Sequence, residues 1–146
     1  MDCYAIHEVD GPLNAGLLDG MNALAPEIFP PLTPQHYSDG FWWIAYHQGI
    51  PCAFAGLVPF WPFPDVGYFK RCLITSPEHY GHGIQFRMMM VRELKARQLG
   101  WPMVVSECGA NNHFSASNFR KAGFELVEPE QKWAGPNDLY WRKVLV

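Results

Sequence analysis

The chain has 146 residues, of which 49% are hydrophobic and 17% charged, and its formal net charge is -3. This length predicts a single domain, residues 1–146, that buries about two-thirds of its unfolded surface around one core. The small negative charge disfavours nucleic acid as a partner, because proteins that bind it mainly through phosphate contacts are basic.

The sequence pattern gives no targeting or membrane segment. Residues 1–8 contain no basic stretch followed by an apolar one, so we expect no secretory signal. The uncharged stretch 50–64 is shorter than the about 20 residues of a spanning helix and is interrupted by prolines. We therefore expect a soluble, cytoplasmic protein without a membrane partner.

The first forty residues predict a strand, a helix and an irregular segment. Residues 4–9 alternate like a strand, and Asp10-Gly11-Pro12 is typical of a helix start, with Asp10 or its neighbour as the cap. The helix is predicted to end before Pro26. Residues 26–40 are rich in proline and are expected to be irregular or to hold a short helix after Thr33-Pro34. The first helix is expected to bury one apolar face, made of Leu13, Leu17, Leu18, Met21 and Leu24.

A hairpin, a third strand and a long helix should follow. Residues 41–47 and 51–60 have strand composition and flank Gln48-Gly49, a pair suited to a tight turn. Residues 61–65 are predicted to be a loop leading to a strand over 68–74. The helix is expected to start at Gly83 and to end at Gly100, before Pro102. Its predicted core face, at helical spacing, consists of Ile84, Met88, Val91 and Leu94.

The C-terminal part predicts three strands and one helix. Residues 103–108 read as a strand and the segment after Asn112 as a helix. Residues 124–127 and 139–145 are expected to close the sheet as an antiparallel pair, with a loop over 129–138 between them.

The turn before the long helix carries the strongest chemical signal. Gly81 and Gly83 let the backbone bend and allow a ligand to come close. The amides in the first turn of the following helix have no partner inside it, and they lie at the positive end of the helix dipole. The pattern therefore predicts an anion site, and we expect it to bind a phosphate group.

Residues 77–85, PEHYGHGIQ, narrow the kind of phosphate site. The segment lacks the Gly-Lys-Ser/Thr of a nucleotide P-loop, and it lacks the third glycine and acidic partner of a dinucleotide fold. It resembles the pyrophosphate loop Gln/Arg-x-x-Gly-x-Gly/Ala of the GNAT superfamily of acyl-CoA N-acyltransferases. Glu78 stands at the Gln/Arg position and Tyr80 where arginine is common, so these two positions give the phosphates no cation.

A second segment, residues 112–124 with the sequence NHFSASNFRKAGF, resembles the last conserved block of the same family. In that block an asparagine opens a short helix and Lys-x-Gly-Phe leads into a strand. The resemblance covers roughly residues 42–124, and the chain is identified as a member of the superfamily. It implies an α/β (mixed α+β) fold, with a central, mixed, mostly antiparallel sheet of about six to seven strands flanked by three to four helices.

The resemblance also implies acetyl-CoA as the acyl-donor substrate. The backbone of Leu73, Ile74 and Thr75 would contact the pantetheine arm, and the amides of residues 79–84 would hold the pyrophosphate. Asn112 would reach a pantetheine amide, or cap its helix, or do both. The expected cofactor-binding residues are Leu73, Ile74, Thr75, His79, Tyr80, Gly81, His82, Gly83, Ile84, Asn112, Asn118 and Phe119.

The implied reaction is direct attack of a neutral amine on the thioester, which needs a base and, in many relatives, an acid. Phe119 stands where those relatives have a tyrosine, and it cannot donate a proton. Ser115, about one helical turn earlier, is our candidate acid, with water or unassisted thiolate departure as alternatives. Glu107, near the end of its strand, is our first candidate base; Glu27 and His47 are the others.

Other residue types allow two further expectations. The cysteines Cys3, Cys52, Cys72 and Cys108 are scattered, so we expect free buried thiols and neither a disulfide framework nor a zinc site. Glu78, His79 and His82 could imitate a metal cluster, but they lie on the predicted anion loop, so no metal is expected.

Aromatic residues crowd the segments that precede the motif strand. We expect most of them in the core and the rest at an apolar cleft or a dimer interface, which favours an acceptor amine with an apolar body over a polybasic protein tail. These aromatic residues are Phe29, Tyr37, Phe41, Trp42, Trp43, Phe60, Trp61 and Phe63.

The predicted function is an acetyl-CoA-dependent N-acetyltransferase acting on a primary amine, with a non-catalytic acyl-CoA sensor or structural protein as the alternative.

Overall fold

The computed structural model describes residues 3–146, which form two compact units. Of the described residues, unit 1 comprises 3–58 and Lys70–Ile84, and unit 2 comprises Pro59–Phe69 and Gln85–Val146. The expectation about a secretory signal concerns residues 1–8, of which the first two lie outside the described part. Among residues 3–146, no helix combines the length and the apolar character needed to cross a membrane.

The strands form a mixed sheet, as predicted. Within the described residues, seven strands are hydrogen-bonded in the order β1-β2-β3-β4-β5-β7-β6 and four α-helices accompany them. β4 and β5 run parallel, whereas β1, β2 and β3 pair antiparallel, as do β5, β7 and β6. The predicted mixed, mostly antiparallel architecture is confirmed.

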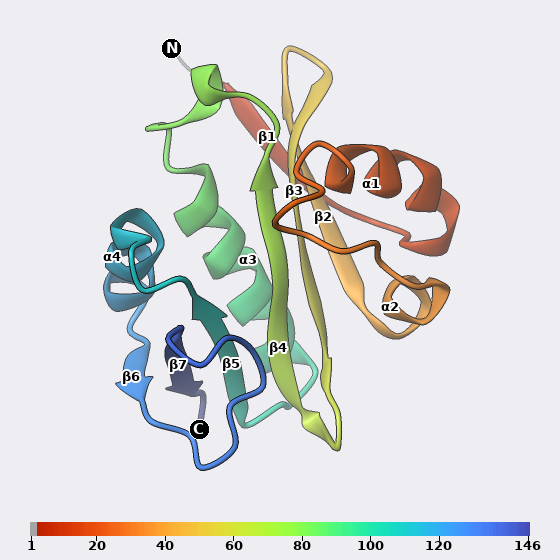
Figure 1. The fold of residues 1–146 in the computed structure, drawn as a ribbon. Helices are drawn as coiled ribbons and strands as arrows, with labels where there is room; N and C mark the ends of the chain where they lie inside the picture. Colours follow the sequence, from red (N-terminus) through yellow and green to blue (C-terminus); the bar gives the residue numbers. More distant parts are fainter. Residues whose placement is uncertain (1–2) are drawn as a thin grey trace. The chain divides into compact units, whose positions relative to one another are not determined.

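Unit 1 is built on an antiparallel ladder of β1 (Tyr4–Val9), β2 (Phe41–His47) and β3 (Ile50–Phe60) (Figure 1). Gln48 and Gly49 join β2 to β3 with φ angles of 51° and 77°. Two consecutive positive φ angles are typical of the two-residue hairpin turn whose twist matches that of the paired strands. The predicted hairpin is confirmed.

The helical part of unit 1 is more broken than the sequence suggested. It consists of a 3-10 turn (Pro12–Asn14), α1 (Ala15–Asn22) and α2 (Pro34–Asp39). The predicted cap at Asp10 is confirmed, because its Oδ1 accepts from the Leu13 amide at 2.9 Å. At the start of α2, the Thr33 hydroxyl accepts from the His36 amide at 3.3 Å.

The predicted core face of the first helix is only partly correct. Leu18 and Met21 are buried, but Leu13, Leu17 and Leu24 are exposed. The 3-10 turn and the end of α1 at Asn22 interrupt the 3.6-residue period, so Leu13 precedes the α-helix and Leu24 follows it. A face drawn through all five residues therefore does not exist.

β4 (Phe63–Ile74) is longer than predicted and runs through both units. The predicted loop over 61–65 is wrong, because only Trp61 and Pro62 separate β3 from β4. Pro64 misled the prediction. Proline is tolerated near the exposed beginning of a strand, where its missing N–H costs no ladder bond.

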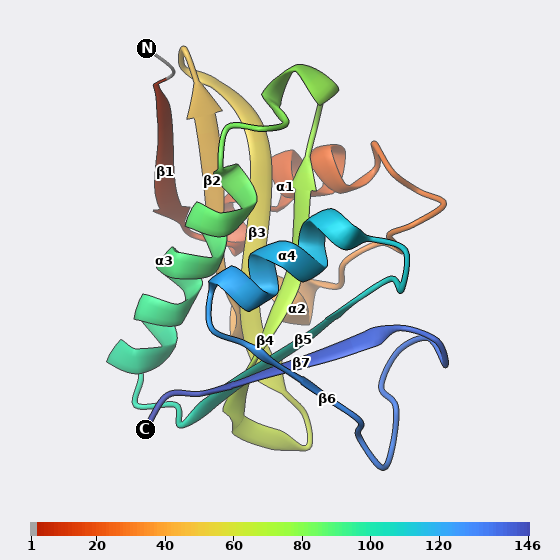
Figure 2. The same ribbon diagram turned by 90° about the vertical axis from the view of Figure 1, so that its left-hand side faces the viewer.

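Unit 2 contains the remaining strands and two helices: β5 (Met103–Cys108), β6 (Glu125–Val127), β7 (Leu139–Val144), α3 (Ile84–Gln98) and α4 (His113–Lys121). The first residue of α3, Ile84, belongs to unit 1. Val66 pairs with Met103, and Tyr68 pairs with Val105. α4 lies beside β7 (Figure 2). Phe119 on α4 stacks on Trp141 of β7, with ring centres 5.4 Å apart. These elements confirm the predicted order.

The predicted core face of α3 is wrong at its C-terminal end. Ile84 and Met88 are buried, but Leu94 is 58% exposed and Arg92 is buried in its place. The Arg92 Nε donates to the Met88 carbonyl oxygen at 3.0 Å, and its guanidinium lies 4.1 Å from the centre of the Phe69 ring. These contacts permit burial of a charged group that sequence periodicity treats as surface.

Candidate functional site

The glycine turn has the backbone conformation that the sequence predicts. Gly81 and Gly83 both have a φ angle of 77°, in the left-handed region, and α3 begins directly after them. A Cβ added at either glycine would meet nothing within 4 Å. The backbone conformation therefore requires glycine here, whereas packing does not, and open space adjoins the amides that start α3.

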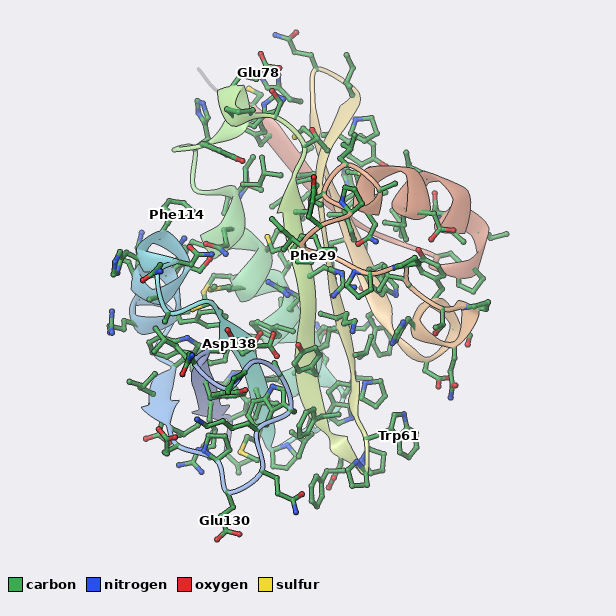
Figure 3. All side chains as sticks on the ribbon, in the orientation of Figure 1. Phe29, Trp61, Glu78, Phe114, Glu130 and Asp138 are labelled. Carbon is green, nitrogen blue, oxygen red and sulfur yellow. The ribbon has the colours of Figure 1, made fainter. Side chains whose placement is uncertain are left out.

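Two side chains of this loop are exposed to solvent. Glu78, labelled in Figure 3, lies on a 3-10 turn (Pro77–His79); its side chain is 76% exposed, and its Oε1 lies 3.5 Å from Nε2 of His79. Tyr80 is 57% exposed. His79 is anchored instead, because its Nδ1 lies 2.9 Å from the hydroxyl of Tyr4, whose ring also packs 5.1 Å from that of His82.

The end of β4 has fewer available backbone groups than we expected. Leu73 is buried and Ile74 is half-buried. The amide and the hydroxyl of Thr75 both donate to the Cys52 carbonyl oxygen, at 2.9 and 3.1 Å. The Thr75 amide is thus committed to β3, and a cofactor could use its carbonyl group only.

In unit 2, Gln85 joins two of the predicted site residues. Its Nε2 donates to Ser115 Oγ at 2.9 Å, and its Oε1 accepts from Asn118 Nδ2 at 2.7 Å. Ser115 is buried and Asn118 is half-buried. In this contact the serine oxygen is the acceptor, so the contact does not use the hydroxyl hydrogen.

Asn112 and Phe119 have clear structural roles in α4. Asn112 Oδ1 accepts from the Ser115 amide at 3.0 Å, so the cap expected of this residue is confirmed. Phe119 is buried between the rings of Trp141 and Phe124, which lie 5.4 and 5.2 Å away. The ring at the position of the family's tyrosine is therefore a core residue.

Glu107 is held by two side chains to which the sequence analysis gave no role. The Tyr68 hydroxyl lies 2.5 and 2.7 Å from its two carboxylate oxygens, and the Trp133 indole N–H donates to Oε1 at 2.9 Å. The strand pairing could have indicated Tyr68, since it lies on the strand parallel to that of Glu107. Nothing in the sequence singles out Trp133, which lies in the irregular segment after β6.

The other candidate bases and the aromatic residues are distributed differently. Glu27 is exposed, and the ring of His47 stacks on that of Tyr4 at 4.7 Å. Most of the aromatic residues were expected in the core, but three of the eight are buried and two are exposed. The buried ones are Tyr37, Trp42 and Trp43, and the exposed ones are Trp61 and Phe63.

The cysteines are free thiols, as expected, but not all are buried. Cys52 and Cys108 are buried, whereas Cys3 is exposed, which corrects the prediction. Burial raises the pKa of Cys52, and it is also the main cause that raises the pKa of Cys108. Across residues 3–146, no three His, Cys, Asp or Glu side chains gather as a metal site would require.

Comparison with known proteins identifies the family. The model of the acetyltransferase (GNAT) family matches residues 16–124, well over half of the chain. The chain therefore belongs to this family and is a GNAT N-acetyltransferase. Enzymes of the family use acetyl-CoA as acyl donor. No curated protein matches the chain.

Solved structures show the same fold at low sequence identity. A candidate acyl-CoA N-acyltransferase of Klebsiella pneumoniae is 20% identical with a TM-score of 0.78, and 98% of each chain is covered. The ribosomal-protein-alanine N-acetyltransferase of Brucella melitensis is 18% identical with a TM-score of 0.76, covering 97% of this chain and 99% of that one. A candidate acetyltransferase of Salmonella typhimurium, solved with its cofactor acetyl-CoA, is 14% identical with a TM-score of 0.77, covering 98% and 94%.

Proposed function

We propose that this acetyltransferase moves the acetyl group of acetyl-CoA to a primary amine of a small molecule, by direct transfer in a ternary complex. The observation that carries the proposal is the turn at Gly81 and Gly83, whose two left-handed residues leave open space beside the first amides of α3. An anion fits there because the helix dipole and the first-turn amides, which have no acceptor within the helix, both favour negative charge.

The donor is held mainly by backbone groups in this proposal. The amides of residues 81–84 bind the pyrophosphate, and the backbone of Leu73 and Ile74, with the Thr75 carbonyl, contacts the pantetheine arm. The amides of His79 and Tyr80, which the sequence also predicted as contacts, instead donate to the Ser76 and Pro77 carbonyl oxygens at 3.1 and 3.0 Å. The side chain of Glu78 is 76% exposed, so solvent screens its charge from the proposed anion site. Separately, Asn112 and Asn118 serve as polar contacts for the cofactor.

The proposed chemistry needs a base and a proton donor. Glu107 takes the proton of the attacking amine, directly or through water, and its hydrogen bonds from Tyr68 and Trp133 fix its orientation. Ser115 donates a proton to the leaving thiolate. The hydrogen bond from Gln85 is compatible with this assignment, because it uses the serine oxygen as acceptor and leaves the hydroxyl hydrogen to donate.

An assay of thiol release tests the function. The protein is incubated with acetyl-CoA and a panel of primary amines, free CoA is followed with a thiol reagent, and the acetylated amine is identified by mass spectrometry. We expect amine-dependent release above the rate of thioester hydrolysis. Acetyl-CoA binding without turnover of any amine would instead support the sensor alternative, and binding of neither donor nor amine would contradict the proposal.

A further inference from the structure

A cavity of about 310 Å³ opens in unit 2 on the sheet face that carries Glu107. Val66 on β4 and Val105 on β5 line it. Tyr68 and Glu107 lie two residues further along the same two strands, and side chains two apart on a strand share a face. The cavity and the Tyr68–Glu107 pair are therefore neighbours on one surface, about 6.6 Å apart along the strands.

The walls of the cavity are aromatic and fixed. Phe60 and Phe63 come from the hairpin between β3 and β4, and Trp133 comes from the segment after β6. The Phe60 and Trp133 rings meet edge to face at 5.1 Å, and Trp133 also contacts the Tyr140 ring at 4.6 Å. Such ring pairs hold a preformed site, which costs a ligand less ordering than a flexible one.

The charged residues that line this cavity each pair with a residue outside the lining. Glu128 and Arg142 are the charged residues of the lining. Arg142 pairs with Glu125 at 2.7 Å, and Glu128, 86% exposed, lies 3.5 Å from Lys132. The remaining lining is apolar, which suits an uncharged ring and disfavours a chain of several positive charges.

Trp133 connects the cavity to the carboxylate. One side of its indole lines the cavity, and its N–H donates to Glu107 Oε1 at 2.9 Å. A flat group packed among these rings lies next to a carboxylate that can receive the proton of an amine. The chemistry that fits both parts is a ring joined to a primary amine by a short alkyl chain.

We propose that this cavity, called the ring pocket and defined by Phe60, Phe63, Val66, Val105 and Trp133, binds the apolar ring of the acceptor, and that the acceptors are primary amines on a short chain from such a ring. The inference rests on the proposed function, since it treats Glu107 as the group that meets the amine. It adds the substrate class and names Phe63 and Trp133 as determinants of specificity.

Two exposed aromatic residues on one hairpin give a matched pair of variants. Phe63 is 57% exposed and lines the ring pocket, whereas Trp61, 63% exposed, is not part of its lining. Trp61 lies at the hairpin tip (Figure 3). Phe63→Ala removes one wall, and Trp61→Ala removes as much aromatic surface outside the pocket. Val127→Phe is a second, independent variant that fills the pocket from β6.

Calorimetry in the presence of CoA measures binding of two probes, 2-phenylethylamine and n-butylamine. We expect the ring-bearing amine to bind at least tenfold more tightly than n-butylamine to the parent. Phe63→Ala and Val127→Phe should each weaken 2-phenylethylamine binding about tenfold, and Trp61→Ala should change it less than twofold. Equal affinities for the two amines, or equal effects of Phe63→Ala and Trp61→Ala, would overturn the inference.

Acetyl-CoA binding and thiol release on the same samples separate this inference from the proposed function. If the protein binds acetyl-CoA and acetylates amines but shows no preference for those with a ring, the ring-pocket inference is wrong and the proposed function stands. Sedimentation of the same variants tests the alternative that a second copy of the chain covers this surface. If Phe63→Ala converts a dimer to a monomer while amine affinity stays unchanged, this face is an interface between copies and the inference is wrong.

Discussion

His36 illustrates how one residue of unit 1 links pH to stability. Its Nδ1 accepts from the Thr33 amide at 3.0 Å, completing a capping box at the start of α2. Burial, together with the positive charges of Lys70 and Arg71, lowers the pKa of His36 below its ordinary value of 6.5. The neutral imidazole is therefore the form that the folded chain holds, and protonation would remove its acceptor nitrogen.

The direction of the pH effect follows from this shift. Below pH 6.5 the unfolded chain binds a proton at His36 that the folded chain does not, so the contribution of His36 is present above pH 6.5 and is lost as the pH falls toward the lower folded pKa. We expect chemical denaturation to give a smaller loss of unfolding free energy between pH 7.5 and 5 for His36→Gln than for the parent. His113→Gln, at an exposed histidine, is the control and should keep the parent's slope.

Ser115 and Phe119 allow a test of the proposed acid. If Ser115 donates the proton, Ser115→Ala should lower kcat by less than about tenfold, because a thioester already has a good leaving group. Phe119→Tyr restores the family's hydroxyl on a ring already positioned in α4, and it should leave CoA affinity nearly unchanged. In that background the loss from Ser115→Ala should be much smaller, which is the sign of a shared role.

Turnover numbers for the four proteins of this cycle give the answer. Equal proportional losses in the two backgrounds, or no loss in either, would exclude Ser115 and leave water or unassisted departure. Thermal denaturation of Phe119→Tyr is the necessary control, because the ring is buried between Trp141 and Phe124 and an added hydroxyl must find a partner there.

At the scale of elements, Asn112 combines a structural role with a proposed binding role. Asn112→Ala removes the cap of α4 and should lower the free energy of unfolding by about 1 kcal/mol. Asn112→Asp keeps an oxygen acceptor for the Ser115 amide and should preserve stability, but it lacks the amide N–H. If that group contacts pantetheine, both variants will bind CoA more weakly; unchanged affinity of folded Asn112→Asp would leave capping as its role.

Element type and order could be predicted from the sequence, but packing faces could not. The alternation in residues 4–9 and the turn pair Gln48-Gly49 act locally, so their signals survive folding. The exposure of Leu94 depends on Arg92, which is buried through a distant ring, Phe69. No window of sequence contains that contact.

The candidate site shows the same division. The conformations of Gly81 and Gly83 are local, and the sequence predicted the turn. The surroundings of Glu107 are not local, because Tyr68 and Trp133 come from positions 39 residues before it and 26 residues after it. Parallel pairing of β4 with β5 brings Tyr68 close to Glu107. Trp133 comes from the irregular segment after β6, which has no recognisable sequence pattern.

At the scale of the whole molecule, the sequence predicts a single domain, which means that the two units should unfold together. β3 and β4 each contribute residues to both units, so unfolding of either unit breaks strands that the other needs. We therefore expect one cooperative transition, with calorimetric and van't Hoff enthalpies that agree. Two separate transitions would mean that the units are independent domains.

The glycine turn is the part on which the whole account depends, and Gly100 provides its control. Gly83 and Gly100 have φ angles of 77° and 75°, and an added Cβ would meet nothing within 4 Å at either position. Gly83→Ala and Gly100→Ala should therefore carry a similar backbone strain and a similar loss of stability, on the order of 1 kcal/mol.

Calorimetric titration of acetyl-CoA into these two variants and the parent is the most direct test. We predict that Gly83→Ala binds at least tenfold more weakly than the parent, a difference of about 1.4 kcal/mol, because its methyl group and strained backbone disturb the amides that hold the pyrophosphate. Gly100→Ala should bind acetyl-CoA like the parent. Equal affinities of the parent and a folded Gly83→Ala, or an equal loss in both variants, would contradict the assignment of the donor to this turn.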